Sequence, residues 1–190
     1  MRCTDTPWMT TGQETHALHL VQVPLPVVHA LAAGEGAAAR VAGAELTPFL
    51  LGPECRSLWR IRSAQLTVTP ADHPWVTRMI VDRRLGATVG LAGFHGAPDA
   101  RGMVEVGYRI DPAHRRRGYA RAALELLLAL AAADSRVAVV RATVSPDNLA
   151  SLALIDQYGF REVGEQWDEE DGLETIFEVA ASSLKREARR

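Results

Sequence analysis

The chain has 190 residues, of which 47% are apolar and 23% charged, and its formal net charge at pH 7 is −2. This length is typical of one domain around one hydrophobic core. The near-neutral charge excludes the broad basic field that many nucleic-acid-binding proteins carry. The two cysteines, Cys3 and Cys55, are too few for a disulfide scaffold and match no metal-ligand spacing, so we expect a reducing compartment and no metal site.

The sequence shows neither a secretory signal nor a membrane span. Its N-terminus lacks a basic region followed by an apolar one, and no apolar run approaches the roughly 20 residues that cross a bilayer. We therefore expect a cytoplasmic protein with no membrane partner. Residues 1–15 are polar and aperiodic, which predicts a loose terminal segment, then one domain over residues 16–181 and a solvated tail over residues 182–190.

The first half of the chain predicts one strand, several helices and a hairpin. Pro24 and Pro26 end the first apolar run, and Gly34 ends the helix after it. Gly86 can supply the positive φ of a turn between two β-branched runs. The expected elements are a strand over 17–23, a helix over 27–33, two or three short helices within 37–62, and adjacent antiparallel strands over 75–82 and 88–95.

The second half alternates strands and helices. In residues 103–110, Val104 and Val106 share one face while Glu105 and Gly107 share the other, which predicts a third meander strand with Glu105 on its polar side. An Ala- and Leu-rich run predicts a packed helix over 119–133. We then expect a strand over 137–144, a helix with proline at its first position that ends at residue 158, and two strands over 160–167 and 173–179. This order predicts an α+β chain.

A basic turn between the third meander strand and the packed helix predicts an anion-binding site. The turn, Asp111–Ala120, contains a cluster of arginines and Gly118 just before the helix begins. The first N–H groups of a helix have no partner inside it, so a phosphate can accept their hydrogen bonds, and Gly118 permits a close approach. A pyrophosphate fits this arrangement, and the alternative is a solvated basic turn whose glycine is required only by its φ.

Three spaced motifs give the chain a resemblance to a known family. The segment Arg115-x-x-Gly118-x-Ala120 fits the Gln/Arg-x-x-Gly-x-Gly/Ala signature of the GNAT acetyltransferases. The run Glu105-Val-Gly-Tyr-Arg-Ile-Asp-Pro before it, with Asn148-x-x-Ser151 and the Gly-Phe step at residue 159 after it, resembles the ribosomal-protein-alanine N-acetyltransferase branch. The resemblance implies a GNAT fold, in which a central, mostly antiparallel sheet with splayed fourth and fifth strands is flanked by helices.

The resemblance also implies acetyl-CoA as co-substrate. Its pyrophosphate would lie on the basic turn, its pantetheine amides along the main chain near Ile110, and its sulfur end near the helix that begins beyond residue 145. The residues expected to bind it are Ile110, Arg115, Arg116, Arg117, Gly118, Tyr119, Ala120, Arg121 and Asn148.

Two residues are expected to carry the chemistry. Glu105 is a carboxylate beside the expected thioester and is a candidate general base, with an ion pair to Arg109 as the alternative. The position where many GNAT enzymes carry a tyrosine is Ile155 here, so the departing thiolate is expected to take a proton from Ser151 or a water, or to leave as the anion, and Ser151 is the candidate we favour. His95 is a second candidate base, because a histidine titrates near neutral pH.

The expected function is acetyl transfer from acetyl-CoA to an amine by direct attack in a ternary complex, without a metal. The alternative is a catalytically degenerate domain that senses acyl-CoA. Nucleic acid is not an expected partner, since the arginine cluster lacks a wider basic face and interleaved aromatics. Either a monomer or a homodimer is compatible with the sequence.

A run of four acidic residues suggests which kind of amine accepts the acetyl group. Asp168, Glu169, Glu170 and Asp171 follow one another in the turn between the last two strands. Four carboxylates in one turn repel each other, so one hypothesis is that they steer a cationic amine or basic peptide to the site. The alternative is a solvated hairpin tip. Whether the acceptor is a protein N-terminus or a small amine stays open.

Overall fold

The computed structural model describes residues 7–9, 17–36, 40–169 and 172–187. The described chain forms two compact units. The N-terminal unit comprises the described residues up to Ala97 together with Gly107–Leu126, and the C-terminal unit comprises Pro98–Val106 and the residues from Leu127 onward. Within the described residues the chain thus passes between the units three times, after Ala97, within β5 after Val106 and within α4 after Leu126.

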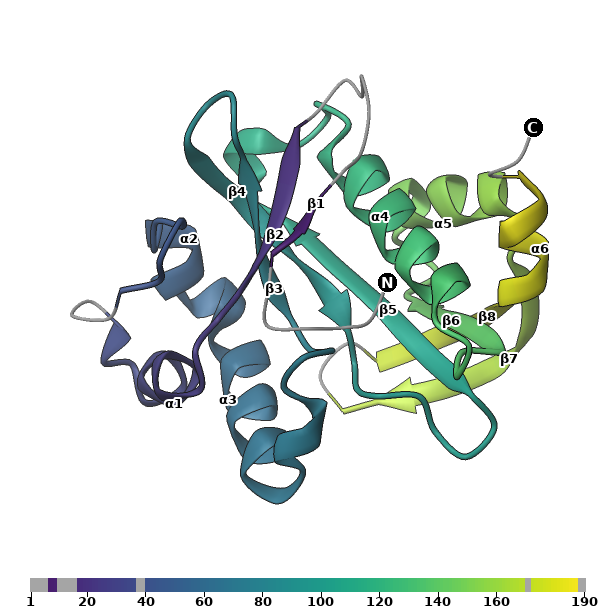
Figure 1. Ribbon diagram of the computed structural model, residues 1–190, viewed down its shortest axis with the longest axis horizontal. Coiled ribbons are helices and arrows are strands. Elements are labelled where there is room, and N and C mark those ends of the chain that lie inside the picture. The colour runs from purple at the N-terminus through teal and green to yellow at the C-terminus, as the bar shows by residue number, and fades with distance from the viewer. Residues whose placement is uncertain (1–6, 10–16, 37–39, 170–171, 188–190) are drawn as a thin grey trace. The chain divides into compact units, whose positions relative to one another are not determined.

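The strands of the described residues follow the hydrogen-bonded order β1-β2-β3-β4-β5-β6-β8-β7, in one mixed sheet of eight strands. The pairs β1–β2, β2–β3, β3–β4, β6–β8 and β7–β8 are antiparallel, whereas β5–β6 is parallel. Helices accompany the strands in both units (Figure 1). The predicted α+β class is therefore confirmed.

The N-terminal unit carries the first four strands, β1 (Trp8–Met9), β2 (Leu18–Gln22), β3 (Arg78–Asp82) and β4 (Ala87–Phe94). The predicted hairpin is confirmed, since β3 and β4 pair through a turn in which Gly86 has a φ of 63°. The first predicted strand is also present as β2. The predicted strand over 75–82 is too long, because β3 begins only at Arg78 and follows the 3-10 turn η2 (Pro70–Asp72).

Strand β1 lies inside the segment that the sequence suggested to be loose. Trp8 is 1% exposed and packs near Phe94, and the buried Arg78 guanidinium lies 3.8 Å from the centre of a Trp8 ring. Aromatic packing and a cation–π contact therefore hold this short strand to the sheet. A single tryptophan in a polar segment gives no periodic signal, which is why the sequence did not predict the strand.

Three helices of the N-terminal unit are grouped together in Figure 1: α1 (Leu25–Ala33), α2 (Pro48–Leu51) and α3 (Pro53–Val68). Helix α1 ends as predicted at Gly34, which has a φ of 82°. The expectation of two or three short helices is wrong for α3, which runs for 16 residues. Pro53 starts this helix rather than interrupting it, because the first turn needs no N–H donor.

The C-terminal unit contains the remaining antiparallel strands and two short helices. Strands β6 (Val139–Val144), β7 (Arg161–Asp168) and β8 (Gly172–Ala180) confirm the three predicted strands of this region. Helix α5 (Leu149–Ile155) continues as the 3-10 turn η4 (Asp156–Tyr158), and α6 (Ala181–Glu187) follows β8. The predicted start of the α5 helix at Pro146 is wrong, because Asn148 caps the helix instead.

Strand β5 (Met103–Ile110) and helix α4 (Tyr119–Ala133) match their predicted bounds and are the two elements shared between the units. Within the C-terminal unit, β5 pairs with β6 from Met103↔Val139 to Glu105↔Arg141, and the ladder stops there. These are the two strands predicted to splay. A parallel ladder of three residue pairs is short for strands of eight and six residues.

Candidate functional site

The basic turn has a strained backbone that leads directly into a helix. After β5, Asp111 caps the 3-10 turn η3 (Pro112–His114) by accepting a hydrogen bond from the Ala113 N–H at 2.9 Å. Arg116 then adopts a φ of 59° and Gly118 a φ of 84°. A positive φ costs an ordinary residue roughly 1–2 kcal/mol, and such strain gathers at anion-binding turns and other functional sites.

Helix α4 begins immediately after the strained turn. Its first main-chain bond runs from the Ala122 N–H to the Gly118 carbonyl at 3.1 Å. The first turn of a helix presents its N–H groups outward along the axis at the positive end of the helix dipole. The half-buried Ala120 adds only a methyl group at this end. The turn can therefore bring main-chain donors close to an anion.

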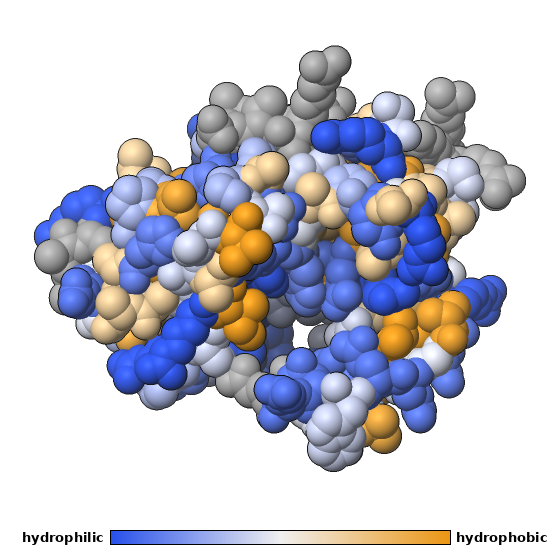
Figure 2. Space-filling view, turned by 90° about the horizontal axis from the view of Figure 1, so that it is seen from below, coloured by the Kyte–Doolittle hydropathy of each residue, from blue (hydrophilic) through white to orange (hydrophobic). Residues whose placement is uncertain are grey.

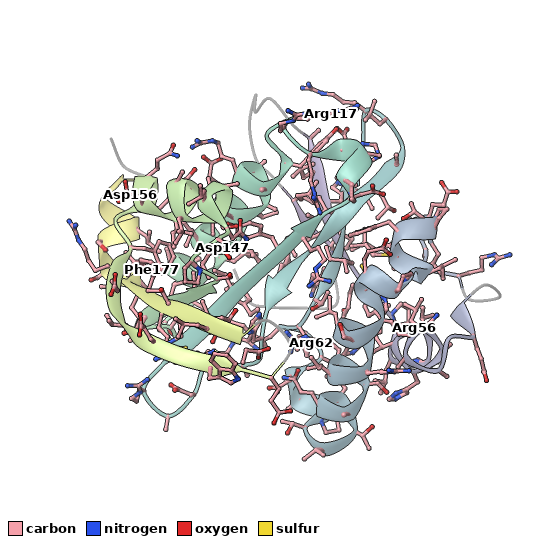
Figure 3. The ribbon with its side chains drawn as sticks, turned by 180° about the vertical axis from the view of Figure 1, so that it is seen from behind. Arg56, Arg62, Arg117, Asp147, Asp156 and Phe177 are labelled. Atoms are coloured by element: carbon pink, nitrogen blue, oxygen red, sulfur yellow. The ribbon has the colours of Figure 1, made fainter. Side chains whose placement is uncertain are left out.

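The arginines of the turn divide into two kinds. The Arg115 Nε donates to the Ile110 carbonyl at 3.2 Å, so this side chain folds back onto the end of β5. Arg116, Arg117 and Arg121 are exposed, and Figure 3 shows Arg117 projecting outward from the turn. The structure thus brings Arg115 to the Ile110 carbonyl, while all four arginines are exposed.

Tyr119 anchors the start of α4 through its side chain. It is 4% exposed, and its hydroxyl donates to the Asp82 Oδ2 at 2.8 Å. Asp82 also accepts the main-chain N–H groups of Arg84 and Leu85, so one carboxylate joins the β3–β4 turn to the helix. Burial and then the Asp82 bond raise the pKa of Tyr119 to about 12. A contact from Tyr119 to a phosphate would therefore come from its main chain.

We expect Tyr119→Phe to lower the free energy of unfolding by about 1–2 kcal/mol at pH 7, because Asp82 loses a buried donor. The folded-state pKa of about 12 exceeds the ordinary value of 10.0, so the parent should lose stability as the pH rises from about 10 to 12. Tyr119→Phe should lack that loss. Urea unfolding of both proteins across this range checks the prediction, and parallel stability curves would contradict it.

Glu105 lies in the C-terminal unit, on the polar face of β5. It is half-buried, and its Oε1 accepts the Thr143 hydroxyl of β6 at 2.8 Å. Arg141, two residues before Thr143 on β6, forms an ion pair with Glu178 of β8 at 2.6 Å. The alternating polar residues of β6 could have indicated Thr143, but its contact with Glu105 depends on the pairing of two strands, in which Arg141 lies opposite Glu105 and Thr143 two residues further on.

The alternative for Glu105 was an ion pair with Arg109. The structure shows Arg109 donating to the Glu54 carbonyl at the start of α3, within the N-terminal unit. Glu105 instead has a hydroxyl donor on the neighbouring strand. This contact identifies one hydrogen-bond partner of Glu105, and its role as general base stays a prediction.

Asn148 and Ser151 are brought together at the start of α5. The Asn148 Oδ1 accepts the Ser151 N–H at 3.2 Å, so Asn148 serves as the helix cap. Ser151 is half-buried. Ile155, at the position where the resemblance places a tyrosine, is 1% exposed. Leu154 and Ile155 are the buried residues of this helix, which is why an apolar side chain fits there.

His95 follows β4 in the N-terminal unit. A Cβ at Gly107 would lie 2.7 Å from the His95 Nε2, so the ring lies directly against β5. Arg62 and Gln65 of α3 donate to the His95 carbonyl at 3.2 and 2.7 Å. Figure 3 shows Arg62 on α3, and it is buried. Sequence reasoning singled out His95 but missed the two helix residues that fix its main chain.

The predicted residues belong to different units. Ile110 and the turn from Arg115 to Arg121 lie in the N-terminal unit, whereas Glu105, Asn148 and Ser151 lie in the C-terminal unit. Across the described residues, no group of His, Cys, Asp and Glu side chains could hold a metal ion. The same part of the chain has no helix with the length and hydropathy needed to span a membrane.

A family model described as an acetyltransferase (GNAT) domain matches residues 43–161, which is more than half of the chain. The chain belongs to the GNAT family. The matched segment contains the strained turn, the capped start of α5 and Glu105. The predicted family is therefore confirmed.

Two curated relatives match parts of the chain. The uncharacterized N-acetyltransferase YjdG of Bacillus subtilis (strain 168) is 38% identical over 72 residues, which are 38% of this chain and 43% of that protein. The uncharacterized N-acetyltransferase p20 of Bacillus licheniformis is 27% identical over 109 residues, 57% of this chain and 61% of that protein. The chain thus spans less than two thirds of either relative.

Solved structures cover nearly the whole fold. The spermidine/spermine N-acetyltransferase SpeG from Vibrio cholerae has a TM-score of 0.62 at 14% identity and covers 90% of this chain and 98% of that one. The ribosomal-protein-S5-alanine acetyltransferase from Vibrio fischeri has a TM-score of 0.60 at 13% identity, with 95% and 99% covered. At these identities the likeness establishes the GNAT fold, as predicted, and leaves the acceptor open.

Proposed function

We propose that this protein transfers an acetyl group from acetyl-CoA to an amine by direct attack in a ternary complex. The observation that carries the proposal is the turn in which Arg116 and Gly118 hold positive φ angles immediately before α4. The backbone accepts strain there, and the turn presents main-chain donors and exposed arginines at one place. Such a turn suits a pyrophosphate, the most highly charged part of the cofactor after its 3′-phosphate.

The residues present fit this co-substrate. Main-chain N–H groups of the turn and the guanidinium groups of Arg116, Arg117 and Arg121 would hold the phosphates. The Ile110 carbonyl accepts one bond from Arg115, and a carbonyl oxygen has a second lone pair for a pantetheine amide. Asn148 uses its carboxamide oxygen to cap α5, and its NH₂ group would donate to the cofactor.

Glu105 is the proposed general base. An ammonium acceptor must lose a proton before its nitrogen can attack the thioester carbon, and the Glu105 carboxylate would accept this proton directly or through a water. The Thr143 hydroxyl holds one carboxylate oxygen at 2.8 Å and fixes the orientation of the other. As the nitrogen–carbon bond forms, the carbon–sulfur bond breaks and the electron pair leaves on sulfur.

The departing thiolate receives a proton from Ser151 or water, or leaves as the anion. Ile155 has no acidic proton, so the usual tyrosine cannot act here. Thiols have pKa values near 8.5, which makes an enzyme acid dispensable at neutral pH. Of the residues of α5, Ser151 is the proposed donor because it is half-buried in the first turn.

A cationic amine is the proposed acceptor class. The acidic turn begins with Asp168 and Glu169, whereas Glu170 and Asp171 lie outside the described residues. Proteins of this fold include a spermidine/spermine N-acetyltransferase and a ribosomal-protein acetyltransferase, both by name. The acidic turn therefore agrees with an amine or basic peptide that carries positive charge.

The buried Ile155 favours a second candidate, a domain that binds acyl-CoA without turnover. Release of free CoA thiol from acetyl-CoA, measured with spermidine and with a short peptide bearing a free N-terminal alanine, separates the two. The proposed enzyme releases thiol in proportion to added amine. A protein that binds acetyl-CoA by calorimetry but shows no amine-dependent release with any amine of a broader pool is the sensor instead.

A further inference from the structure

A cavity of about 360 Å³ opens beside α5 in the C-terminal unit, and none of the residues proposed above for catalysis or cofactor binding lines it. We call it the Phe177 cavity. Apolar side chains form most of its wall, and Asp156 supplies a carboxylate. Its lining residues are Leu152, Ala153, Ile155, Asp156, Phe160 and Phe177. Figure 3 shows Asp156 and Phe177 on neighbouring elements, η4 and β8. A volume of this size accommodates a large side chain or a small organic group.

The face of the β7–β8 hairpin that carries Phe177 also carries exposed apolar side chains toward the hairpin end, which we call the apolar strip. Residues directly opposite in antiparallel strands share a face, so Phe177 shares its face with Ala142 of β6 and Glu162 of β7. On the same face, Trp167 lies opposite Leu173. Val179, nearer the core, is buried on this face, whereas Leu173 is 44% and Trp167 77% exposed. The apolar side chains on this face are therefore buried near Val179 and become exposed toward the hairpin end.

The exposed large apolar side chains of the C-terminal unit gather on these elements. Among the described residues they are Leu149, Val163, Trp167 and Leu173, and all four lie on α5 or the hairpin. Figure 2 shows apolar side chains reaching the surface at the right, with hydrophilic ones around them. Exposed apolar side chains rimmed by polar ones are a feature of interaction sites.

The charges on this surface have one sign. Glu162 and Glu165 share the face of Phe177, since they lie opposite Phe177 and Thr175, and Asp156 lines the cavity. Arg161 lies opposite Glu178 and therefore on the other face of the hairpin. Helix α5 and η4 contain no lysine, arginine or histidine. Within the described residues of these elements, the apolar strip is thus interleaved with carboxylates and lacks a cation.

We propose that the Phe177 cavity and this strip form a docking surface for a basic amphipathic peptide segment of a partner protein. An apolar side chain of the segment would fill the cavity, and another would pack on Trp167. Lysine or arginine side chains between them would face Asp156, Glu162 and Glu165, which supply complementary charge. The proposal concerns peptide binding and does not require acetyl transfer, although Trp167 directly precedes the acidic turn that begins at Asp168.

The probe is a short synthetic peptide in which leucine and lysine alternate, with both termini blocked. Trp167 reports binding, because it is 77% exposed while Trp8, Trp59 and Trp75 are at most 3% exposed. Tryptophan emission should shift to shorter wavelength as the peptide covers the ring. A matched peptide with serine in place of leucine carries the same charge, and equal binding of that peptide would overturn the proposal by showing general charge attraction only.

Two variants locate the surface. Glu162→Gln with Glu165→Gln should weaken the leucine–lysine peptide about tenfold, since two exposed charge pairs are lost. Glu35→Gln with Glu125→Gln makes the same charge change at exposed sites on α4 and beyond α1, and should leave the affinity within about twofold. Equal effects of the two double variants would place the binding elsewhere and overturn the proposal.

Ala153→Arg tests the cavity without removing packing. Ala153 is exposed on α5, so the helix tolerates the longer side chain, which should enter the cavity and lower the affinity at least about tenfold. Unchanged affinity of this variant would exclude the cavity. Sedimentation of the parent decides the remaining alternative, because self-association that is lost in Ala153→Arg, with no peptide binding, would make the surface a contact between copies of this chain and overturn the proposal.

Discussion

Replacing Gly118 with aspartate is expected to weaken acetyl-CoA binding on the order of a hundredfold, while the protein remains folded. Gly118 has a φ of 84°, where a side chain costs roughly 1–2 kcal/mol, so the turn would relax toward another conformation. The new carboxylate would also face the phosphates, and a like charge repels them. Together these effects amount to roughly 2–3 kcal/mol, and titration calorimetry with acetyl-CoA measures them.

Gly34→Asp is the matched control. Gly34 has a φ of 82°, no atom lies within 4 Å of a Cβ built there, and the residue ends α1. The same strain and the same charge are introduced, but at a helix end that has no proposed phosphate contact. This control should lose stability and keep its affinity for acetyl-CoA. If both variants bind acetyl-CoA like the parent, the turn does not hold the pyrophosphate.

Much of the fold could be predicted from periodicity and turn residues. The polar and apolar alternation of β5, the Ala- and Leu-rich α4 and the glycine turn between β3 and β4 each carry a local signal. The strained turn was also visible, because a glycine and an arginine cluster before a helix is a local pattern. These features need only neighbouring residues to specify them.

Features set by distant partners could not be predicted. Strand β1 depends on Trp8 packing near Phe94 and Arg78, which are far along the chain. The expectation of short helices within 37–62 came from treating glycines and prolines as helix breakers, although Pro53 is the first residue of α3. Thr143 reaches Glu105 only through the parallel register of β5 and β6. Such contacts follow from strand register, which the sequence does not specify locally.

At the start of α5, Asn148 fits both a helix cap and a contact with the co-substrate. Asn148 was expected to face the co-substrate, and the structure uses its carbonyl oxygen to cap the helix. The sequence pattern for a cap and for a polar ligand contact is the same, an asparagine before a short apolar run. The cofactor contact of Asn148 therefore stays a prediction that rests on its remaining NH₂ group.

We expect Glu105→Gln to lower the turnover number about a hundredfold or more once an acceptor is known, because a general base contributes roughly that much or more. The amide is nearly the same size and still accepts the Thr143 hydroxyl, whose oxygen lies 2.8 Å from Oε1, so the strand register should survive. Acetyl-CoA affinity should change by less than about twofold, since the amide alters only proton transfer from the acceptor. Steady-state kinetics and calorimetry separate these two effects.

The pH profile and Thr143 decide whether Glu105 acts on the amine or only holds two strands together. In the parent, kcat/KM should rise with pH in two steps, one from the carboxylate and one from the acceptor amine, and Glu105→Gln should keep only the amine step. Thr143→Val keeps the carboxylate but removes the hydroxyl that orients it, which should lower turnover about tenfold, while Thr143→Ser retains the hydroxyl and most of the turnover. A structural role predicts a different pattern, in which Glu105→Gln and Thr143→Val lower the free energy of unfolding and leave the profile of the folded enzyme unchanged. That outcome would exclude Glu105 as the general base and leave His95 or water as the candidates. The hydrogen bond between Thr143 and Glu105 would then serve only to join β5 and β6.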